Sequence, residues 1–266
     1  MYSNCGLLVP STDEYTDLWE PFLFYLRKFW PDCPFEIILG TNTPTSNVPQ
    51  GALVQPTVAG INWGEHVRML LATITSDIVL LVMPDYFLDA PVDTRYIVDC
   101  VEYISKSKTG YVRLSPTPPP RRRAPAVGNV GLVELGLREP YSTSLAASLW
   151  SSTVLFNLLD DSDSPWTFER TGPERRQTNV QFCTTAKPIL SYKPTGALVR
   201  GRWTREAMRR LTEDGMEDAM RFKPSMSRCQ ALQHNVKSAA FRLISSMSPR
   251  SVRFFNQYVT RKGARR

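Results

Sequence analysis

Apolar residues in the first 115 positions alternate between short uninterrupted runs and runs with helical spacing. Four short runs are typical of buried strands, namely residues 5–9, 35–39, 52–55 and 78–83. Between these runs, apolar side chains recur every three or four positions, which predicts amphipathic helices. The order of elements predicts an α/β fold in which βα units surround a mixed, mostly parallel sheet.

Polar residues stand where the predicted helices should begin. Ser11 and Glu14 have the spacing of a capping box, Asn62 can cap a helix over 63–74, and Asp93 can cap the next helix. A strand over 111–114 should follow the helix that Asp93 begins.

The alternation becomes less regular after residues 116–129, where prolines and three consecutive arginines, 121–123, predict an extended loop. Four further elements are predicted beyond it: a strand over 145–150, a helix over 152–159, a strand over 197–200 and a helix capped by Thr204.

Charge divides the chain into two parts. The 266 residues carry a net charge of +7, yet residues 221–266 hold 11 of the 32 Lys and Arg and none of the 25 Asp and Glu. The rest of the chain therefore has 21 basic and 25 acidic residues, a charge of −4. We predict an α/β domain over residues 1–220 and a basic, amphipathic, helical extension over 221–266.

The confined basic charge is typical of a segment that lies on an anionic membrane surface, whereas a nucleic-acid-binding protein should also be basic on its main domain. A helix packed on the domain is the alternative that the sequence leaves open. No apolar run reaches about 18 residues, and the five cysteines lack metal-ligand spacing. We therefore expect a cytoplasmic protein, peripheral on the inner face of the membrane, with no specific nucleic-acid partner.

Five polar residues follow the carboxyl ends of predicted strands: Thr12, Asp13, Thr41, Asn42 and Asp85. The last follows the most apolar strand, which Pro84 ends. Because the carboxyl ends of parallel strands meet at one edge of a sheet, these side chains can converge on one ligand-binding crevice.

Three stretches carry a resemblance to a known family. They are DEYTDLWEPFLFYLRKFWPDCPFEIILGTN, WGEHVRMLLATITSDIVLLVMPDYFLDAPVD, and SPWTFE with the later VRGRWTREAM. In this order they resemble bacterial glycosyltransferases of GT-A-like, Rossmann-like fold from surface-polysaccharide gene clusters of the capsule and O-antigen type, over about residues 5–211. The resemblance implies transfer of a sugar from a nucleotide-sugar donor to a glycan or lipid-linked acceptor.

The family places a pair of acidic residues after the central strand, where Mg²⁺ or Mn²⁺ binds the donor diphosphate. In this chain Met83 and Pro84 occupy positions that are acidic in the relatives, which leaves Asp85 as the single metal-ligand candidate. The divalent cation that the resemblance implies therefore has an incomplete motif, and the sequence leaves metal dependence open.

Inverting transfer needs a carboxylate that takes the proton of the acceptor hydroxyl. The resemblance implies Glu169 for this role, with Asp163 as the second candidate, and it assigns Trp150 and Trp166 to the acceptor side. Inversion is favoured over retention, while the donor sugar and linkage stay open.

On the donor side, the resemblance adds Trp63 and Arg68, at the start of the helix that Asn62 begins, to Thr12, Asp13, Thr41, Asn42 and Asp85. Asp13 can equally be an ordinary helix-start residue, and Arg68 can meet a phosphate. Two other classes remain open. A nucleotidyltransferase should have a more complete acidic pair, and a non-enzymatic RNA-binding protein would use the extension and Arg121–Arg123.

Overall fold

The computed structural model describes residues 3–45, 48–117, 119–120, 126–137, 139, 141–193, 196–234 and 236. The predicted arginine loop at 121–123 and most of the predicted basic extension, residues 235 and 237–266, lie outside the described residues.

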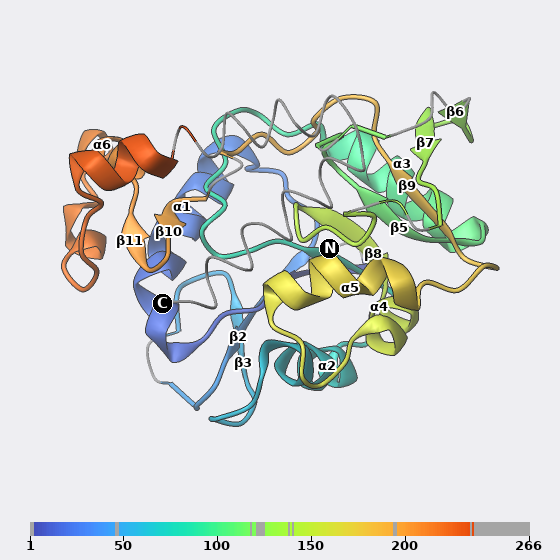
Figure 1. Ribbon diagram of the computed structural model, residues 1–266, viewed down its shortest axis with the longest axis horizontal. Coiled ribbons are helices and arrows are strands. Elements are labelled where there is room, and N and C mark those ends of the chain that lie inside the picture. The colour runs from blue at the N-terminus through green and yellow to red at the C-terminus, as the bar shows by residue number, and fades with distance from the viewer. Residues whose placement is uncertain are drawn as a thin grey trace.

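Among the described residues, nine strands form one sheet in the order β3-β2-β1-β4-β8-β5-β9-β7-β6 (Figure 1). Their bounds are β1 Cys5–Val9, β2 Glu36–Thr41, β3 Leu53–Pro56, β4 Ile78–Leu81, β5 Thr109–Arg113, β6 Ala126–Val127, β7 Leu132–Glu134, β8 Ser148–Ser151 and β9 Gln181–Thr184. Strands β3, β2, β1 and β4 are parallel, and β8 is antiparallel to both β4 and β5. The predicted α/β fold with a mixed, mostly parallel sheet is confirmed.

Helices cover both faces of this sheet. Their bounds are α1 Trp19–Phe29, α2 Trp63–Thr73, α3 Thr94–Lys106, α4 Ser152–Leu158, α5 Pro165–Arg175 and α6 Arg205–Glu213, with 3₁₀ helices at Asp13–Leu18 and Glu217–Met220. A separate two-stranded hairpin, β10 Leu198–Val199 and β11 Arg202–Trp203, leads into α6.

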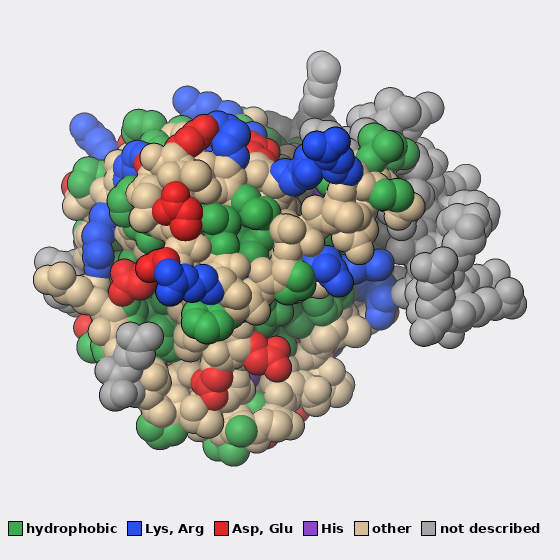
Figure 2. Space-filling view, turned by 90° about the vertical axis from the view of Figure 1, so that its left-hand side faces the viewer, with side chains coloured by type: hydrophobic (Ala, Val, Ile, Leu, Met, Phe, Trp, Pro, Cys, Tyr) green, Lys and Arg blue, Asp and Glu red, His purple; other side chains and the backbone are tan. Residues whose placement is uncertain are grey.

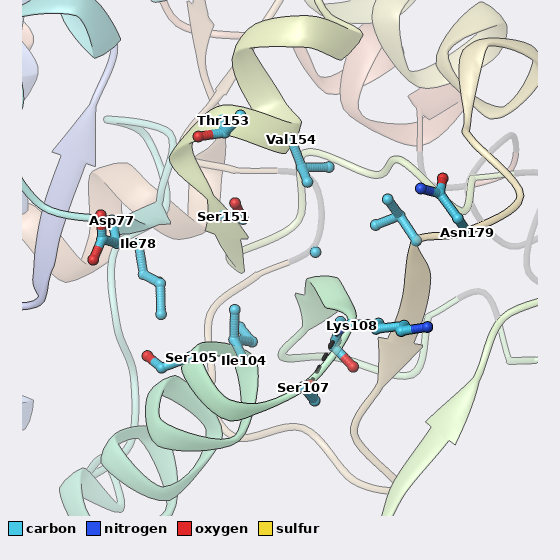
Figure 3. A pocket seen from close by; sticks show the side chains of 13 residues that line it. Asp77, Ile78, Ile104, Ser105, Ser107, Lys108, Ser151, Thr153, Val154 and Asn179 are labelled. Carbon is cyan, nitrogen blue, oxygen red and sulfur yellow. Dashed lines mark hydrogen bonds between the residues drawn. The ribbon is translucent and has the colours of Figure 1, made fainter.

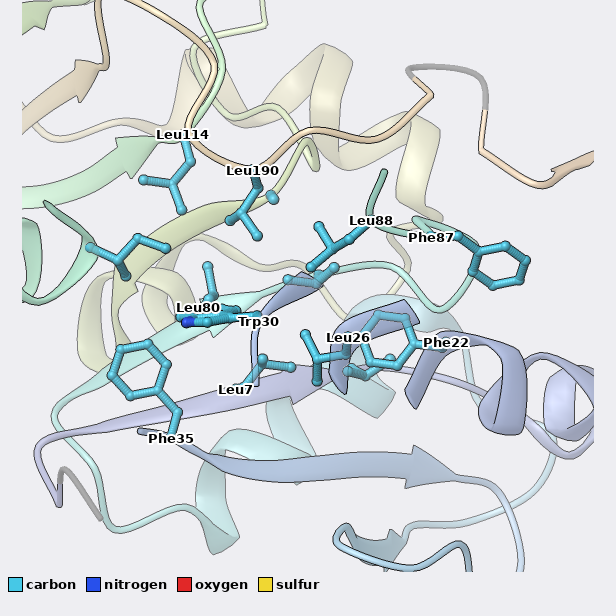
Figure 4. Close-up of a cluster of buried hydrophobic side chains, with 14 of the residues drawn as sticks. Leu7, Phe22, Leu26, Trp30, Phe35, Leu80, Phe87, Leu88, Leu114 and Leu190 are labelled. Atoms are coloured by element: carbon cyan, nitrogen blue, oxygen red, sulfur yellow. The ribbon is translucent and has the colours of Figure 1, made fainter. Parts of the chain in front are cut away.

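Adjacent residues of one strand pack in two different hydrophobic clusters, one on each face of the sheet. Leu7 and Leu80 pack with α1 and α3, as the cluster in Figure 4 shows, whereas Leu8 and Leu81 pack with α2, α4 and α5. Because successive side chains of a strand point to opposite faces, a strand buried on both sides must be apolar throughout. This is why the run at 78–83 predicts the central position that β4 occupies between β1 and β8.

Several predicted details need correction. The strand predicted over 145–150 begins at Ser148, because the preceding backbone turns toward α5, where the Leu145 amide donates a hydrogen bond to Glu169. The predicted capping box is wrong, since the Ser11 hydroxyl accepts a hydrogen bond from the Trp19 indole and caps no helix.

Of the other predicted helix caps, two are formed and one is not. Asn62 precedes α2 without a side-chain cap, whereas Asp93 and Thr204 accept hydrogen bonds from the Tyr96 and Ala207 amides, as predicted. Strands β7 and β9 and helix α5 were not predicted, and β6 lies inside the segment that was expected to be a loop.

The chain stays in contact with the main domain beyond residue 220. The Trp203 amide donates to the Pro224 carbonyl, and the Met226 amide donates to the Trp203 carbonyl. The Lys223 ammonium pairs with Asp17, and the side chains are 13% and 5% exposed respectively. No helix in the described part of the chain is long and apolar enough to cross a membrane.

The Lys223–Asp17 pair generates a stability prediction. Lys223→Ala leaves the buried Asp17 carboxylate without its cation, which should lower the free energy of unfolding by about 3 kcal/mol. Urea denaturation at neutral pH measures the change. Lys106→Ala, which removes the exposed pair with Glu102 on α3, is the matched control and should cost less than about 1 kcal/mol. Equal losses in the two variants would show that the Lys223 pair contributes no more than a surface pair.

Candidate functional site

A cavity of about 550 Å³ lies beyond the carboxyl ends of β1 and β4. These two strands are neighbours in the sheet. After β1 the chain adds β2 and β3 on one side, and it then crosses over to add β4 on the other side of β1. Such a point of divergence is where open α/β sheets bind ligands. The lining comprises Pro10, Ser11, Thr12, Tyr15, Leu18, Asn42, Ile61, Trp63, His66, Met83, Pro84, Asp85, Tyr86, Leu145, Pro165, Trp166, Glu169, Leu198, Arg200 and Gly201.

A second hollow, also of about 550 Å³, lies at the opposite edge of the sheet (Figure 3). It is bordered by Asp77 and Lys108, which precede β4 and β5, and by Asn179, which precedes β9. The ends of β4, β5 and β9 that open into it are amino ends, and antiparallel β8 reaches it with its carboxyl end at Ser151. Most of its polar side chains are exposed. The cavity at the carboxyl edge is therefore the candidate functional site.

Asp85 is placed at this cavity by the end of β4 and by a later segment that packs on it. Gly196, with φ of +68°, approaches so closely that an added Cβ would lie 2.0 Å from the Asp85 Oδ2. The Ala197 amide donates to the Asp85 backbone carbonyl at 2.8 Å. Burial raises the pKa of the Asp85 carboxyl to about 7, although the backbone amides of Asp85 and Leu198 oppose the rise.

Glu169 reaches the same cavity from α5. Its Oε1 accepts hydrogen bonds from the Ser144 hydroxyl at 2.9 Å and from the Leu145 amide at 2.7 Å. Among the described residues, both of these bonds end on Oε1, which leaves Oε2 for a ligand. Burial raises the pKa of Glu169, while those two donors and the nearby Arg113 guanidinium lower it. A carboxylate whose pKa is raised above its ordinary value is a better proton acceptor, which suits a general base.

Arg113 supports the segment that holds Glu169. Its side chain is fully buried, and the guanidinium donates to the Tyr141 carbonyl at 3.2 Å and to the Thr184 hydroxyl at 3.4 Å. Tyr141 has φ of +58°, an uncommon conformation for a residue other than glycine. The bond to Arg113 therefore helps to hold the turn from which Ser144 and Leu145 reach Glu169.

The predicted donor residues divide into two groups. Thr12, Asn42 and Trp63 line the cavity. The Asp13 carboxylate instead accepts hydrogen bonds from Thr41, Asn42 and Thr43, which lower its pKa, with the Thr41 hydroxyl contributing most. Asp13 thus holds the loop after β2 in shape, and the side chain of Thr41 is buried beneath that loop.

Arg68 lies away from the cavity. Its guanidinium pairs with Asp161 at 3.3 Å and lies over the Phe156 ring, 4.5 Å from the ring centroid. The side chain contacts α4 and the Leu159 carbonyl that follows it, and Arg68 is not among the residues that line the cavity.

Two predicted catalytic or acceptor residues turn out to be structural. Trp150 is fully buried, and its ring packs 4.2 Å from Tyr111 between centroids, so it cannot touch an acceptor. Asp163 is buried and accepts hydrogen bonds from the Arg175 guanidinium at 2.7 Å and the Asp160 amide at 3.0 Å. Its carboxylate therefore stabilises the loop before α5. Trp166, in contrast, lines the cavity with 76% of its surface exposed.

Four lining residues whose side chains can bind a ligand through polar atoms were not predicted from the sequence: Tyr15, His66, Tyr86 and Arg200. The Tyr86 ring stacks on Tyr192 at 4.4 Å between centroids. His66 forms a hydrogen bond to the Thr57 hydroxyl through Nδ1, while its buried Nε2 has no partner among the described residues. Burial lowers the pKa of His66, so its ring is neutral at pH 7. A histidine inside a helical pattern gives no signal that it faces a cavity.

The residues at the cavity do not fit a divalent cation. Mg²⁺ and Mn²⁺ prefer several oxygen ligands, with carboxylates foremost. No group of three acidic, histidine or cysteine side chains among the described residues could hold a metal ion. The residues next to Asp85 that also line the cavity are Met83, Pro84 and Tyr86, and none of them carries a carboxylate. Oε1 of Glu169 is already engaged by the Leu145 amide. Asp89 is likewise occupied, by the Ser191 hydroxyl.

No protein-family model and no curated protein matches this sequence. Among solved structures, TarS 1-349 of S. aureus in complex with UDP is 13% identical, covering 70% of this chain and 59% of that chain with a TM-score of 0.46. The mannosyltransferase PcManGT of Pyrobaculum calidifontis, in complex with GDP-Man and Mn²⁺, is 14% identical, covering 97% and 79% with a TM-score of 0.45.

A cytidylyltransferase of Leptospira borgpetersenii is 13% identical, covering 65% of this chain and 71% of that chain with a TM-score of 0.39. The chain spans 60% of the length of TarS 1-349 in a further structure of that protein. With such identities and TM-scores below 0.5, these likenesses assign no role to a residue, so the chemistry must come from the site's own geometry.

The Gly196 contact can be tested by stability. Gly196→Ala adds a Cβ against the Asp85 carboxylate and strains a backbone at positive φ, so it should lower the free energy of unfolding by more than about 2 kcal/mol. Gly201→Ala is the matched control, because its φ of +70° gives a similar backbone cost with no atom within 4 Å of the added Cβ. Denaturant midpoints compare the two. If Gly201→Ala lowers the free energy of unfolding as much as Gly196→Ala does, the close contact with Asp85 makes no contribution of its own to the loss.

The raised pKa of Asp85 predicts a pH dependence of stability. Since the folded carboxyl, with a pKa of about 7 instead of 3.8, holds its proton more tightly than the unfolded one, wild type should lose stability as pH rises through this interval. Asp85→Asn does not titrate, so its stability relative to wild type should increase between pH 4 and pH 7 by about 2 kcal/mol, reduced from the full effect by solvent in the cavity. Chemical denaturation across this range measures it, and parallel pH profiles for the two proteins would contradict it.

Proposed function

We propose that this chain is a glycosyltransferase that moves a sugar from a nucleotide-sugar donor to a glycan or lipid-linked glycan acceptor. The observation that carries the proposal is the presence of Asp85 and Glu169 in one cavity at the divergence of β1 and β4. Sugar transfer needs a polar group next to the donor and a carboxylate that can accept a proton. Asp85 would meet the first need and Glu169 the second.

The donor would lie along the carboxyl ends of β1, β2 and β4. Thr12 and Asn42 follow β1 and β2, and Trp63 at the start of α2 adds an aromatic surface on which a base can stack. Asp85 would then face the sugar or the diphosphate. This order places the activated end of the donor toward α5.

Glu169 would act as the general base. As the acceptor oxygen forms its bond to the anomeric carbon, its proton passes to Glu169, and the bond from that carbon to the phosphate oxygen breaks to release the nucleoside diphosphate. A carboxylate with one oxygen held by Ser144 and Leu145 is fixed in orientation while the other can take the proton. Direct displacement of this kind inverts the anomeric centre.

Trp166 would form the acceptor side. It stands at the first turn of α5, three residues before Glu169, and its indole face is exposed at the cavity. Apolar faces of sugars pack on such rings, which would bring an acceptor hydroxyl toward Glu169. The sequence resemblance supports an acceptor of cell-surface polysaccharide synthesis that is carried on a membrane lipid.

A nucleotidyltransferase is the competing function, and the site disfavours it. That chemistry concentrates negative charge of a triphosphate and an attacking phosphate, which calls for a complete acidic metal site. The described residues around Asp85 do not provide one. Release of pyrophosphate from a nucleoside triphosphate would identify that reaction.

The proposal predicts the behaviour of two variants of α5. A thermal-shift screen with UDP-, GDP-, CMP- and dTDP-sugars selects the donor, because a ligand of the folded state raises the melting temperature. With that donor, Glu169→Gln should lower turnover by about 10²–10⁴-fold while the donor still raises the melting temperature. Release of nucleotide and formation of glycoside are both measured.

Glu174→Gln, an exposed carboxylate on the same helix, is the control and should keep wild-type turnover. Full turnover in Glu169→Gln would remove this residue from the reaction. Failure of every donor to bind wild type would overturn the proposed function itself.

A further inference from the structure

We propose that Arg200, at the tip of the β10–β11 hairpin, binds the diphosphate of the donor and supplies the positive charge that a divalent cation would otherwise provide. The inference rests on the proposed function and makes it more specific, since it assigns the phosphate-binding residue.

The hairpin holds Arg200 at the cavity in an unusual backbone conformation. β10 and β11 are antiparallel and are joined by Arg200 and Gly201, with φ of +52° and +70°. Two successive residues at positive φ define the tight turn that Asn-Gly or Gly-Gly normally occupies. An arginine at the first position costs stability without improving the turn, so the turn itself does not account for it.

The base of the hairpin fixes where its tip lies. Trp203 is fully buried, and its backbone bonds to Pro224 and Met226 on one side. On the other side, the segment before Leu198 is held by the contacts of Gly196 and Ala197 with Asp85. The hairpin therefore forms part of the cavity wall, and Arg200 lines the cavity with a side chain that is exposed to solvent.

The charges of the lining favour an anion at Arg200. Among the described residues that line the cavity, Arg200 is the single Lys or Arg, and it shares the lining with two carboxyl groups, Asp85 and Glu169. On the face of the molecule around α6 and the hairpin, acidic and basic side chains are interspersed (Figure 2). A diphosphate in the cavity thus depends on this individual guanidinium, whose planar donors match phosphate oxygens.

The cavity lining does not fit a divalent cation, so another group must neutralise the diphosphate. A leaving nucleoside diphosphate gains negative charge that some group must neutralise. Asp85 lacks the second carboxylate that a cation site needs, because Met83 and Pro84 precede it. An arginine in the same lining, Arg200, can provide this neutralisation from the protein's own residues.

The test measures nucleotide binding by calorimetry. UDP, GDP, CDP and dTDP, each with its monophosphate, are titrated into wild type in EDTA and in Mn²⁺. We expect one diphosphate to bind in EDTA, more tightly than its monophosphate. Arg200→Gln should weaken the diphosphate at least tenfold and leave the monophosphate unchanged. Arg202→Gln, on the same hairpin and outside the cavity lining, should bind as wild type does.

A second variant separates folding from binding. Arg200→Gly removes the guanidinium and relieves the positive φ, so it should be at least as stable as wild type and still lose diphosphate affinity. Binding that requires Mn²⁺ and is unchanged in both Arg200 variants would overturn the inference and leave the proposed function standing. A wild-type protein that binds no nucleotide in either condition would overturn the proposed function together with the inference.

Discussion

The contact between Asp85 and the segment around Gly196 joins the two halves of this fold at the cavity. The end of β4 supplies the carboxyl, and a segment from the far end of the described chain packs on it through a glycine that has no room for a Cβ. Without that closure, the β10–β11 hairpin would have no fixed position, and the cavity would lose the wall that carries Leu198, Arg200 and Gly201. Burial by the same contact is what makes the carboxyl reluctant to ionise.

The two carboxyl groups of the cavity are buried in different ways. Asp85 is enclosed mainly by backbone, whereas Glu169 is held by two directed hydrogen bonds and lies near Arg113. Glu169 is oriented by hydrogen-bond donors and keeps one oxygen available, so it can act as a base. Asp85, which the Gly196 backbone contacts closely, is better suited to contact a neutral hydroxyl or to share a proton. The surroundings, more than the residue types, thus separate their proposed roles.

The first half of the fold could be predicted because its strands are apolar on both faces. The runs at 5–9 and 78–83 have this property, and they became β1 and β4 at the centre of the sheet. β9 and α5 escaped prediction for opposite reasons. The strand contains Gln181 and Thr184, whose side chains form hydrogen bonds inside the sheet, and the helix contains Gly172 and Pro173, which normally interrupt helices.

For the site, the position of Asp85 could be predicted, because it follows an apolar strand and strand ends converge by topology. Its role in binding stays a prediction. Trp150 and Asp163 could not be judged from sequence, since an aromatic ring or a carboxylate looks the same whether it faces a ligand or closes a buried contact. The burial of Trp150 beside Tyr111 and the bond from Arg175 to Asp163 depend on elements far apart along the chain. Arg200 gave no signal either, because its significance comes from a turn whose dihedral angles the sequence does not encode locally.

The buried pair between Lys223 and Asp17 also bears on how the C-terminal part of the chain is attached. Asp17 belongs to the six-residue 3₁₀ helix Asp13–Leu18, and two other residues of that helix, Tyr15 and Leu18, line the cavity. Lys223 is therefore paired with a short element that also forms one wall of the cavity. Displacing the chain at Lys223 would have to break this enclosed ion pair or tilt the 3₁₀ helix, so the position of Lys223 and the shape of the cavity are mechanically linked.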